Sequence, residues 1–208
     1  MTKEKPYIYV VDDDPSVRTA LARLLGSAGY DVKTFSSALD FLSFDHPDAP
    51  GCIILDIQMP KLSGLELQTC LNEKDLLLPI IFITGHGTVP ASVRAFKGGA
   101  IEFLQKPFEE MEILNAVSFG IDKSCQQRRT HNELKMLRER FEELTPRERE
   151  VFKLVAGGML NKQVAFDLQT TEKTIKVHRA RVMQKMGAQS FADLVLYAQK
   201  LGICSSIG

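Results

Sequence analysis

Five short apolar segments, separated by amphipathic ones, constrain the fold of this chain more than any other feature. The apolar segments are Tyr7–Val11, Val32–Phe35, Cys52–Asp56, Pro79–Thr84 and Glu102–Leu104. Most are almost continuously apolar rather than alternating, which is typical of parallel strands covered on both faces. The segments that follow them have helical periodicity, and these are Pro15–Ala28, Ala38–Phe44, Leu65–Lys74, Val89–Lys97 and Glu109–Lys123. Five strand–helix repeats predict a doubly wound α/β domain, flavodoxin-like, with a five-stranded parallel sheet.

The last part of the chain, residues 144–208, is predicted to be entirely helical. Its four expected helices begin at residues that can cap a helix or end at glycine, namely Thr145, Asn161 and Ser190 for the starts and Gly157, Gly158 and Gly187 for the ends. Glu172–Met186 is the longest of them, and a three-residue turn separates it from the helix before. Two helices joined in this way have the outline of a helix-turn-helix.

Residues 123–143 contain neither glycine nor proline and are predicted to form a helical linker between domains at residues 1–122 and 144–208. Apolar residues recur on one face at Leu134, Leu137, Phe141 and Leu144. This stripe fits either a short two-heptad coiled coil or docking onto a neighbouring domain.

The net charge of zero conceals an uneven distribution. Residues 1–122 contain 10 Lys and Arg against 17 Asp and Glu, whereas residues 123–208 contain 16 against 9. The second part is therefore expected to meet a polyanion, and the acidic first part to do something else.

Carboxylates follow two of the predicted strands. Asp12, Asp13 and Asp14 come after the first strand and Asp56 ends the third, while Thr84 ends the fourth and Lys106 follows the fifth. In a parallel sheet these ends meet at one edge, where clustered acids need a cation. Mg²⁺ suits such oxygen ligands, and one carboxylate can then act as a nucleophile toward phosphorus. Any single aspartate could instead be a helix cap, as Asp14 before Pro15 is expected to be.

In order and spacing, the motifs VVDDD, LDIQMP, ITGHG and FLQKPF resemble the receiver domain of two-component response regulators over residues 6–122. The resemblance implies Asp56 as phosphoacceptor and Mg²⁺ (or Mn²⁺) held by Asp12, Asp13, Asp56 and the backbone carbonyl of Gln58. It implies that Lys106 contacts the phosphoryl group and that a cis bond precedes Pro107. Thr84 and Phe103 would form the switch pair. Gln58 and His86 occupy positions that tune autodephosphorylation in this family.

The predicted helix Glu172–Met186 has two distinct faces. Ile175, Val182 and Met186 share one face and are expected to pack inward. The opposite face carries cations at its edges and small residues along its middle, which suits a helix in the major groove. A solvated surface helix is the alternative. No aromatic residue lies on this face, which argues against binding single strands by stacking.

Residues 144–201 also resemble the LuxR/FixJ-type (NarL-type) DNA-binding domain, through LTPREREVFKLVAGG, NKQVAFDL and TEKTIKVHRARVMQKM. The resemblance implies Lys176 and Val177 as base-reading residues and Ala180 at a further reading position. Lys173, Thr174, Arg179 and Arg181 would contact phosphates. The whole chain resembles the FixJ subfamily of response regulators.

These resemblances imply a phosphorylation-controlled transcription factor, most simply an activator, and not an enzyme acting on a separate substrate. Its partners would be a sensor histidine kinase, double-stranded promoter DNA and RNA polymerase, with a homodimer formed through roughly residues 89–104. An aspartyl phosphohydrolase is a poor alternative, because its nucleophile follows the first strand and its substrate needs a cap domain. A receiver that acts through protein contacts alone is the other alternative, and salt-dependent DNA binding would exclude it.

Other classes of protein do not fit the sequence. No apolar stretch approaches the roughly 18 residues of a membrane span, and the N-terminus lacks the apolar core of a signal peptide. The four cysteines, Cys52, Cys70, Cys125 and Cys204, show no CxxC spacing, so we expect free thiols in a reducing cytoplasm. The resemblance to response regulators implies that this is the cytoplasm of a bacterium. The first strand leads into aspartates rather than a glycine-rich phosphate loop, which argues against nucleotide binding.

Overall fold

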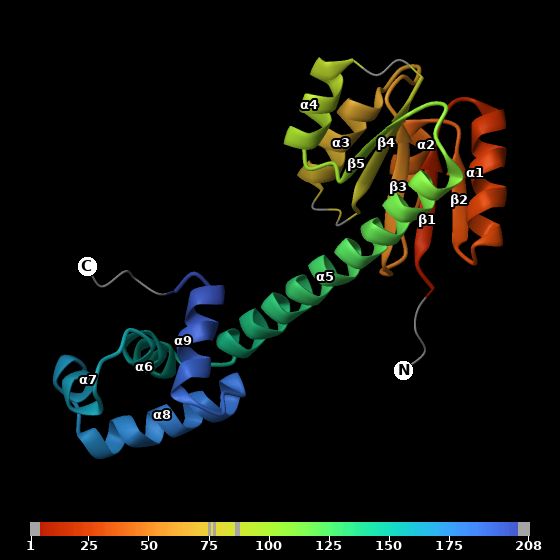
Figure 1. Ribbon diagram of the computed structural model, residues 1–208. Helices are drawn as coiled ribbons and strands as arrows, with labels where there is room; N and C mark the ends of the chain where they lie inside the picture. Colours follow the sequence, from red (N-terminus) through yellow and green to blue (C-terminus); the bar gives the residue numbers. More distant parts are fainter. Residues whose placement is uncertain (1–4, 75, 77, 86–87, 204–208) are drawn as a thin grey trace. The chain divides into compact units, whose positions relative to one another are not determined.

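The computed structural model describes residues 5–203 apart from 75, 77, 86 and 87. The chain forms two compact units, Met1–Arg128 and Arg129–Gly208. The first unit contains a sheet with helices on both faces, and the second consists of helices (Figure 1). No described helix is long and apolar enough to cross a membrane.

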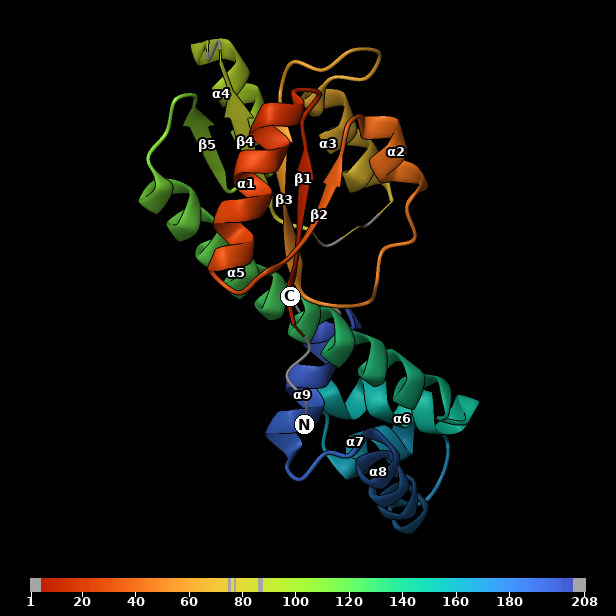
Figure 2. The ribbon, with the colours of Figure 1, turned by 90° about the vertical axis from the view of Figure 1, so that its right-hand side faces the viewer.

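The sheet of the first unit has five parallel strands in the order β2-β1-β3-β4-β5 (Figure 2). Its elements are β1 (Tyr7–Val11), α1 (Pro15–Ser27), β2 (Asp31–Phe35), α2 (Ala38–Ser43), β3 (Gly51–Asp56), α3 (Gly64–Glu73), β4 (Ile80–Thr84), α4 (Val89–Lys97), β5 (Glu102–Gln105) and the start of α5 (Glu110–Glu142). The strand order reverses beside β1, so the carboxyl ends of β1 and β3 flank the switch point. This architecture confirms the predicted doubly wound domain.

Residues alternate along the strands between two apolar cores, one on each face of the sheet. On one face, side chains such as Tyr9, Leu55 and Phe82 pack with α2, α3 and α4. On the other face, side chains such as Ile8 and Ile54 pack with α1 and α5. Burial on both faces explains why the three inner strands, β1, β3 and β4, are almost continuously apolar in sequence.

Helix α5 continues without a break from the first unit into the second, whereas the sequence predicted that the receiver helix would end at Lys123 and a linker would follow. The difference has a simple cause, since no residue between Gly120 and Pro146 is a glycine or proline that would end a helix. The Ser124 hydroxyl accepts the Gly51 N–H at 3.2 Å, and Arg128 forms an ion pair with Asp48. The three-part division at residues 122 and 143 stays a prediction.

The second unit combines the end of α5 with four further helices, α6 (Pro146–Ala156), α7 (Asn161–Asp167), α8 (Glu172–Met186) and α9 (Phe191–Lys200). Leu137, Phe141 and Leu144 of the predicted stripe pack into the core of this unit. These side chains are thus used within one chain, which supports docking and not a coiled coil. The predicted caps Thr145 and Ser190 and the left-handed Gly187 are confirmed.

One predicted cap is wrong. Asn161 was expected to cap α7, but Leu160 occupies the N-cap position, and the Gln163 side chain accepts its N–H at 2.7 Å. The Asn161 amide oxygen instead accepts a hydrogen bond from Arg179 of α8 at 3.2 Å. A tertiary contact has therefore displaced the local one. Among the cysteines, Cys52, Cys70 and Cys125 are free thiols, and Cys204 lies outside the described residues.

Candidate functional site

Three charged side chains from three strand ends meet at one edge of the sheet. The Nζ of Lys106, directly after β5, lies 2.6 Å from Oδ2 of Asp12 and 2.8 Å from Oδ1 of Asp56. Asp12 follows β1 and Asp56 is the last residue of β3. Two carboxylates and an ammonium that lie far apart in the sequence are thus in direct contact.

Backbone N–H groups hold both carboxylates in place. The second oxygen of Asp12 accepts the N–H of Asp14 at 2.9 Å, and the second oxygen of Asp56 accepts the N–H of Gln58 at 2.7 Å. Helix α3 begins very close to this site, because a Cβ added to Gly64 would lie 2.3 Å from the Asp56 carbonyl oxygen. Only glycine allows the helix to start there without displacing the acid.

Burial makes this cluster electrostatically unusual. Loss of water raises the pKa of Asp56, the Lys106 ammonium opposes this rise, and the neighbouring Asp12 adds to it. For Lys106, burial acts against the ammonium, but hydrogen bonds to Asp12 and Asp56 outweigh it and raise the pKa. The two acids therefore share one cation at a site poor in water, and such perturbed groups are typical of functional sites.

The other residues after β1 and β3 differ in exposure. Asp13 is exposed, and so is the side chain of Gln58. Asp14 is the N-cap of α1, as predicted. Its carboxylate accepts hydrogen bonds from the hydroxyl of Ser16 and from the N–H of Ser16, the latter at 2.8 Å, and these bonds, that of the hydroxyl foremost, lower the pKa of Asp14. Among the described residues, no group of three or more His, Cys, Asp or Glu side chains is gathered closely enough to hold a metal ion.

The predicted switch residues lie on the neighbouring strands. Thr84 is the last residue of β4 and is buried, and its carbonyl accepts the N–H of Lys106 at 2.7 Å. Phe103 on β5 is half-buried and packs against the apolar core on one face of the sheet. The peptide bond between Lys106 and Pro107 is cis, as the resemblance implies. His86 lies outside the described residues.

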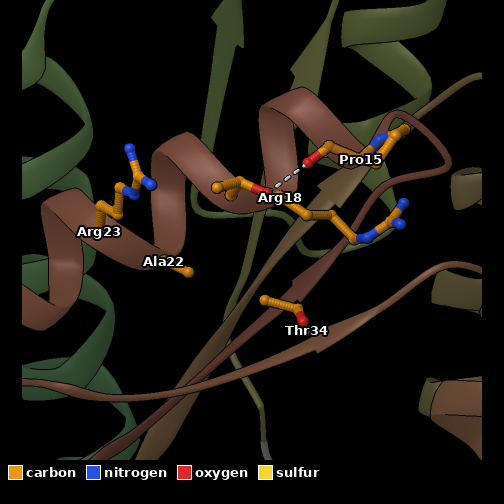
Figure 3. Close-up of a pocket in the computed structure, with 6 residues that line it drawn as sticks. Pro15, Arg18, Ala22, Arg23 and Thr34 are labelled. Atoms are coloured by element: carbon orange, nitrogen blue, oxygen red, sulfur yellow. Dashed lines mark hydrogen bonds between the residues drawn. The ribbon is translucent and has the colours of Figure 1, made fainter.

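One neighbour of the site was not anticipated from the sequence. Nη1 of Arg18, on α1, donates to the Asp12 carbonyl oxygen at 2.7 Å. Arg18 also lines an open hollow of about 480 Å³ between α1 and β2, to which Ala22, Arg23 and Thr34 contribute (Figure 3). No sequence motif marks Arg18, because its position depends on where α1 packs against β1.

Helix α8 divides as its sequence pattern predicts. Ile175, Val182 and Met186 are buried in the core of the second unit. The opposite face is exposed and consists of Lys173, Lys176, Val177, Ala180, Arg181 and Gln184. This helix therefore presents cations and small side chains to solvent along a single face.

Two of the residues expected to contact phosphates are engaged within the protein. Nη1 of Arg179 donates to Asn161, and its guanidinium lies 5.6 Å from the centre of the Phe191 ring. Thr174 is half-buried, and its N–H donates to the N-cap residue Thr171 at 3.2 Å. The other two residues expected to contact phosphates, Lys173 and Arg181, are exposed.

Two family models match the chain. The model described as "Response regulator receiver domain" matches residues 8–118, and the model described as "Bacterial regulatory proteins, luxR family" matches residues 142–198. The first match alone covers more than half of the chain. This protein belongs to the response regulators.

Individual relatives agree with this membership over nearly the full length. The regulator is 45% identical to Nodulation protein W of Bradyrhizobium diazoefficiens, over 97% of this chain and 89% of that protein. It is 44% identical to Response regulator protein TodT of Pseudomonas putida, over 97% and 88% of the two chains. The solved structure of the response regulator StyR shares 46% identity and a TM-score of 0.82, covering 94% and 99%.

The regulator therefore belongs to a FixJ-like class of two-component proteins in which a receiver domain and a LuxR-type helix-turn-helix domain control transcription. Its family consists of regulatory transcription factors rather than classical enzymes. Receiver domains generally bind Mg²⁺ for phosphorylation, and they imply a kinase partner. The LuxR-type domain implies DNA binding.

Proposed function

We propose that this regulator accepts a phosphoryl group on Asp56 from a sensor histidine kinase and then dimerises and binds promoter DNA to activate transcription. The observation that carries the proposal is the contact of Lys106 with both Asp12 and Asp56. An acid at the end of β3, an acid after β1 and a cation after β5 are the groups that acyl phosphate formation needs.

In the transfer step, a carboxylate oxygen of Asp56 attacks phosphorus. The bond between phosphorus and the donor nitrogen of the kinase breaks, and the leaving imidazole keeps its electron pair. The Lys106 ammonium lies within hydrogen-bonding distance of the Asp56 carboxylate, so it is positioned to hold an oxygen of the bound phosphoryl group. The Thr84 hydroxyl would contact another oxygen. The same groups would support only self-hydrolysis of the acyl phosphate and no turnover of other substrates.

The donor chemistry of this site suits Mg²⁺ or Mn²⁺, although its three acids are not gathered into a ready-made metal site. Asp12, Asp13 and Asp56 supply three negative charges against the one positive charge of Lys106, and all the available ligands are oxygens. Asp12, Asp13, Asp56 and the Gln58 carbonyl would hold the ion. It would neutralise the charge that builds up as the phosphoryl group approaches a carboxylate.

The surface around α4 and β5, residues 89–104, is the proposed contact of the phosphorylated dimer. Its exposed apolar side chains are Val89, Val93 and Phe96, of which Val89 is 77% exposed. Thr84 is the last residue of β4, next to this surface, and Phe103 lies on β5 within it. A rearrangement of these two side chains would therefore change the shape of the surface. A dimer would place two copies of α8 on two half-sites of promoter DNA.

The exposed face of α8 is the proposed DNA contact. Lys176, Val177 and Ala180 would approach bases in the major groove, and Lys173, Thr174, Arg179 and Arg181 would contact phosphates. The exposure of Lys173, Lys176 and Arg181 supports this assignment. RNA polymerase would be the partner at the promoter, and the bacterial cytoplasm the location of the protein.

Intact-protein mass spectrometry after incubation with acetyl phosphate and Mg²⁺ tests the proposal. We expect wild type to gain about 80 Da, the mass of one phosphoryl group, and Asp56→Asn to gain nothing. Gln58→Ala is the matched control, because it keeps the backbone carbonyl and should still be modified. Sedimentation of the same samples should show a dimer only where the mass has increased.

An equal gain of mass in wild type and Asp56→Asn would contradict the assignment of Asp56. Rapid turnover of small phosphate esters would instead favour a phosphohydrolase. Modification without any change in sedimentation would contradict the dimerisation step alone.

A further inference from the structure

The C-terminal end of α8 is tied to the segment that joins the two units. Nη1 of Arg140, near the end of α5, donates to the carbonyl oxygen of Met186 at 3.1 Å. In the opposite direction, Nζ of Lys185 donates to Glu148 at 2.7 Å and to the carbonyl of Glu143 at 3.1 Å. Arg140 and Lys185 therefore connect the last turn of α8, the helix that carries the proposed DNA contacts, to α5 and to the start of α6.

Arg140 is held in place by its own neighbours in α5. Leu137 is 3% exposed and Phe141 packs against the same apolar core, so the turn that carries Arg140 is fixed on the second unit. All three residues precede residue 142, where the match to the luxR family model begins. Their attachment to the second unit, and that of Arg140 to α8 in particular, is thus an addition to the part of the chain that the family model covers.

Gly187 leaves space for this contact. It ends α8 with φ +67°, a left-handed conformation that favours glycine. A Cβ at this position would lie 2.6 Å from Nη1 of Arg140, so a larger residue would displace the guanidinium. A cation at a helix C-terminus also interacts favourably with the last carbonyls and the helix dipole.

We propose that Arg140 is a positioning residue for DNA recognition, which fixes the orientation of α8 by binding its last carbonyl group. Arg140 touches no base or phosphate in this proposal. It acts through Met186, the final residue of the helix whose exposed face carries Lys176 and Val177. The DNA-binding unit then begins inside α5 and not at residue 144. This inference rests on the proposed binding of DNA by α8.

The test uses the full-length chain treated with acetyl phosphate and a duplex that wild type selects from a random-sequence pool. We expect Arg140→Ala to weaken binding about three- to tenfold at temperatures well below unfolding. The slope of log affinity against log salt should stay unchanged, because no phosphate contact is lost. Arg140→Lys, which keeps a cation, should recover part of the affinity. Arg138→Ala, exposed on the same helical turn, is the control and should bind as wild type does.

Each other result overturns the inference. If Arg140→Ala binds as tightly as wild type, the contact does not position α8. If the salt slope falls by about one, Arg140 contacts a phosphate directly. If Arg140→Ala lowers only the unfolding temperature, or if it fails to fold and Arg140→Gln binds as wild type does, the role of Arg140 is structural. Failure of wild type to select any duplex would instead reject the proposed DNA binding, and the inference with it.

Discussion

The two units of the molecule bring their functional residues together in opposite ways. The receiver site is assembled from the ends of separate strands, its central side chains are buried or half-buried, and Lys106 contacts both acids. The proposed DNA contacts lie on one helix, within nine consecutive residues, and most are exposed. Substitutions in the first site should therefore alter folding stability and chemistry together. Substitutions at the exposed positions of α8 should alter binding and leave stability almost unchanged.

The largest effect is expected for Lys106→Met in the receiver. Without the ammonium, Asp12 and Asp56 face each other in a site poor in water, so phosphoryl acceptance should fall sharply. We expect the free energy of unfolding at pH 8 to drop by about 1–3 kcal/mol, a range reduced because Lys106 is partly exposed. Mass spectrometry with acetyl phosphate measures the first effect, and urea denaturation measures the second.

The loss of stability in Lys106→Met should depend on pH in a defined direction. The pKa of Asp56 is already raised in the folded protein, mainly by burial, and removal of Lys106 would raise it further. A carboxyl group whose pKa is higher in the folded than in the unfolded protein adds to stability at pH values below its unfolded-state pKa. This contribution is lost as the pH rises through its folded-state pKa. The difference from wild type should thus shrink at pH 4. Lys33→Met, an exposed lysine on β2, is the control, and an equal loss at both pH values would contradict the electrostatic explanation.

An intermediate effect is expected for substitutions on α8. Because the proposed contacts on this helix are mostly exposed, we expect their loss to change DNA binding alone. Arg181→Ala should weaken binding about tenfold across all sequences and lower the salt slope by about one, as expected for loss of a phosphate contact. Lys176→Ala should weaken binding to the selected duplex and relax the sequence preference. Fluorescence anisotropy at several salt concentrations measures both.

The unfolding temperature of both α8 variants should equal that of wild type. Lys153→Ala, an exposed lysine on α6, is the matched control for loss of one positive charge. Binding that does not depend on salt, or that is unchanged in both variants, would favour a receiver that acts through protein contacts. A large loss of stability in either variant would contradict the expectation that substitutions on the exposed face of α8 change binding alone.

The sequence predicted those parts of the molecule that follow from periodicity or from local chemistry. Parallel strands align their carboxyl ends, so the meeting of Asp12, Asp56 and Lys106 at one edge of the sheet could be expected once the strands were predicted to be parallel. The two faces of α8 follow equally from helical spacing. Contacts that depend on how helices pack could not be predicted in this way, and Arg18 beside Asp12 is one example.

The wrong cap has the same origin. Asn161 has the chemistry of a helix cap, but its amide oxygen is used by Arg179 from another helix. A tertiary contact with a partner 18 residues away in the sequence thus outweighs the local preference. Arg179 is engaged by Asn161 and Phe191 within the protein, and its phosphate contact stays a prediction.

The smallest effect is expected for Glu148→Gln, which tests an exception to the comparison. Glu148 lies in the second unit but is 2% exposed, and its Oε2 accepts hydrogen bonds from Lys185 and from the N–H of Thr145. These bonds, that of Lys185 foremost, lower the pKa of Glu148. Stability from a lowered carboxyl pKa is present above the unfolded value and is lost as pH falls through the folded value.

Glu148→Gln keeps an oxygen that can accept the Thr145 N–H and removes only the charge. At pH 7 we therefore expect the unfolding temperature to fall by about 2–4 °C, with the difference disappearing at low pH as Glu148 becomes protonated in wild type. Glu150→Gln, an exposed residue on the same helix, should show no such pH dependence. If the two variants behaved alike, burial of Glu148 would have no electrostatic consequence. The greater effect on stability expected for substitutions in the receiver site would then come from the paired charges of that site and not from burial as such.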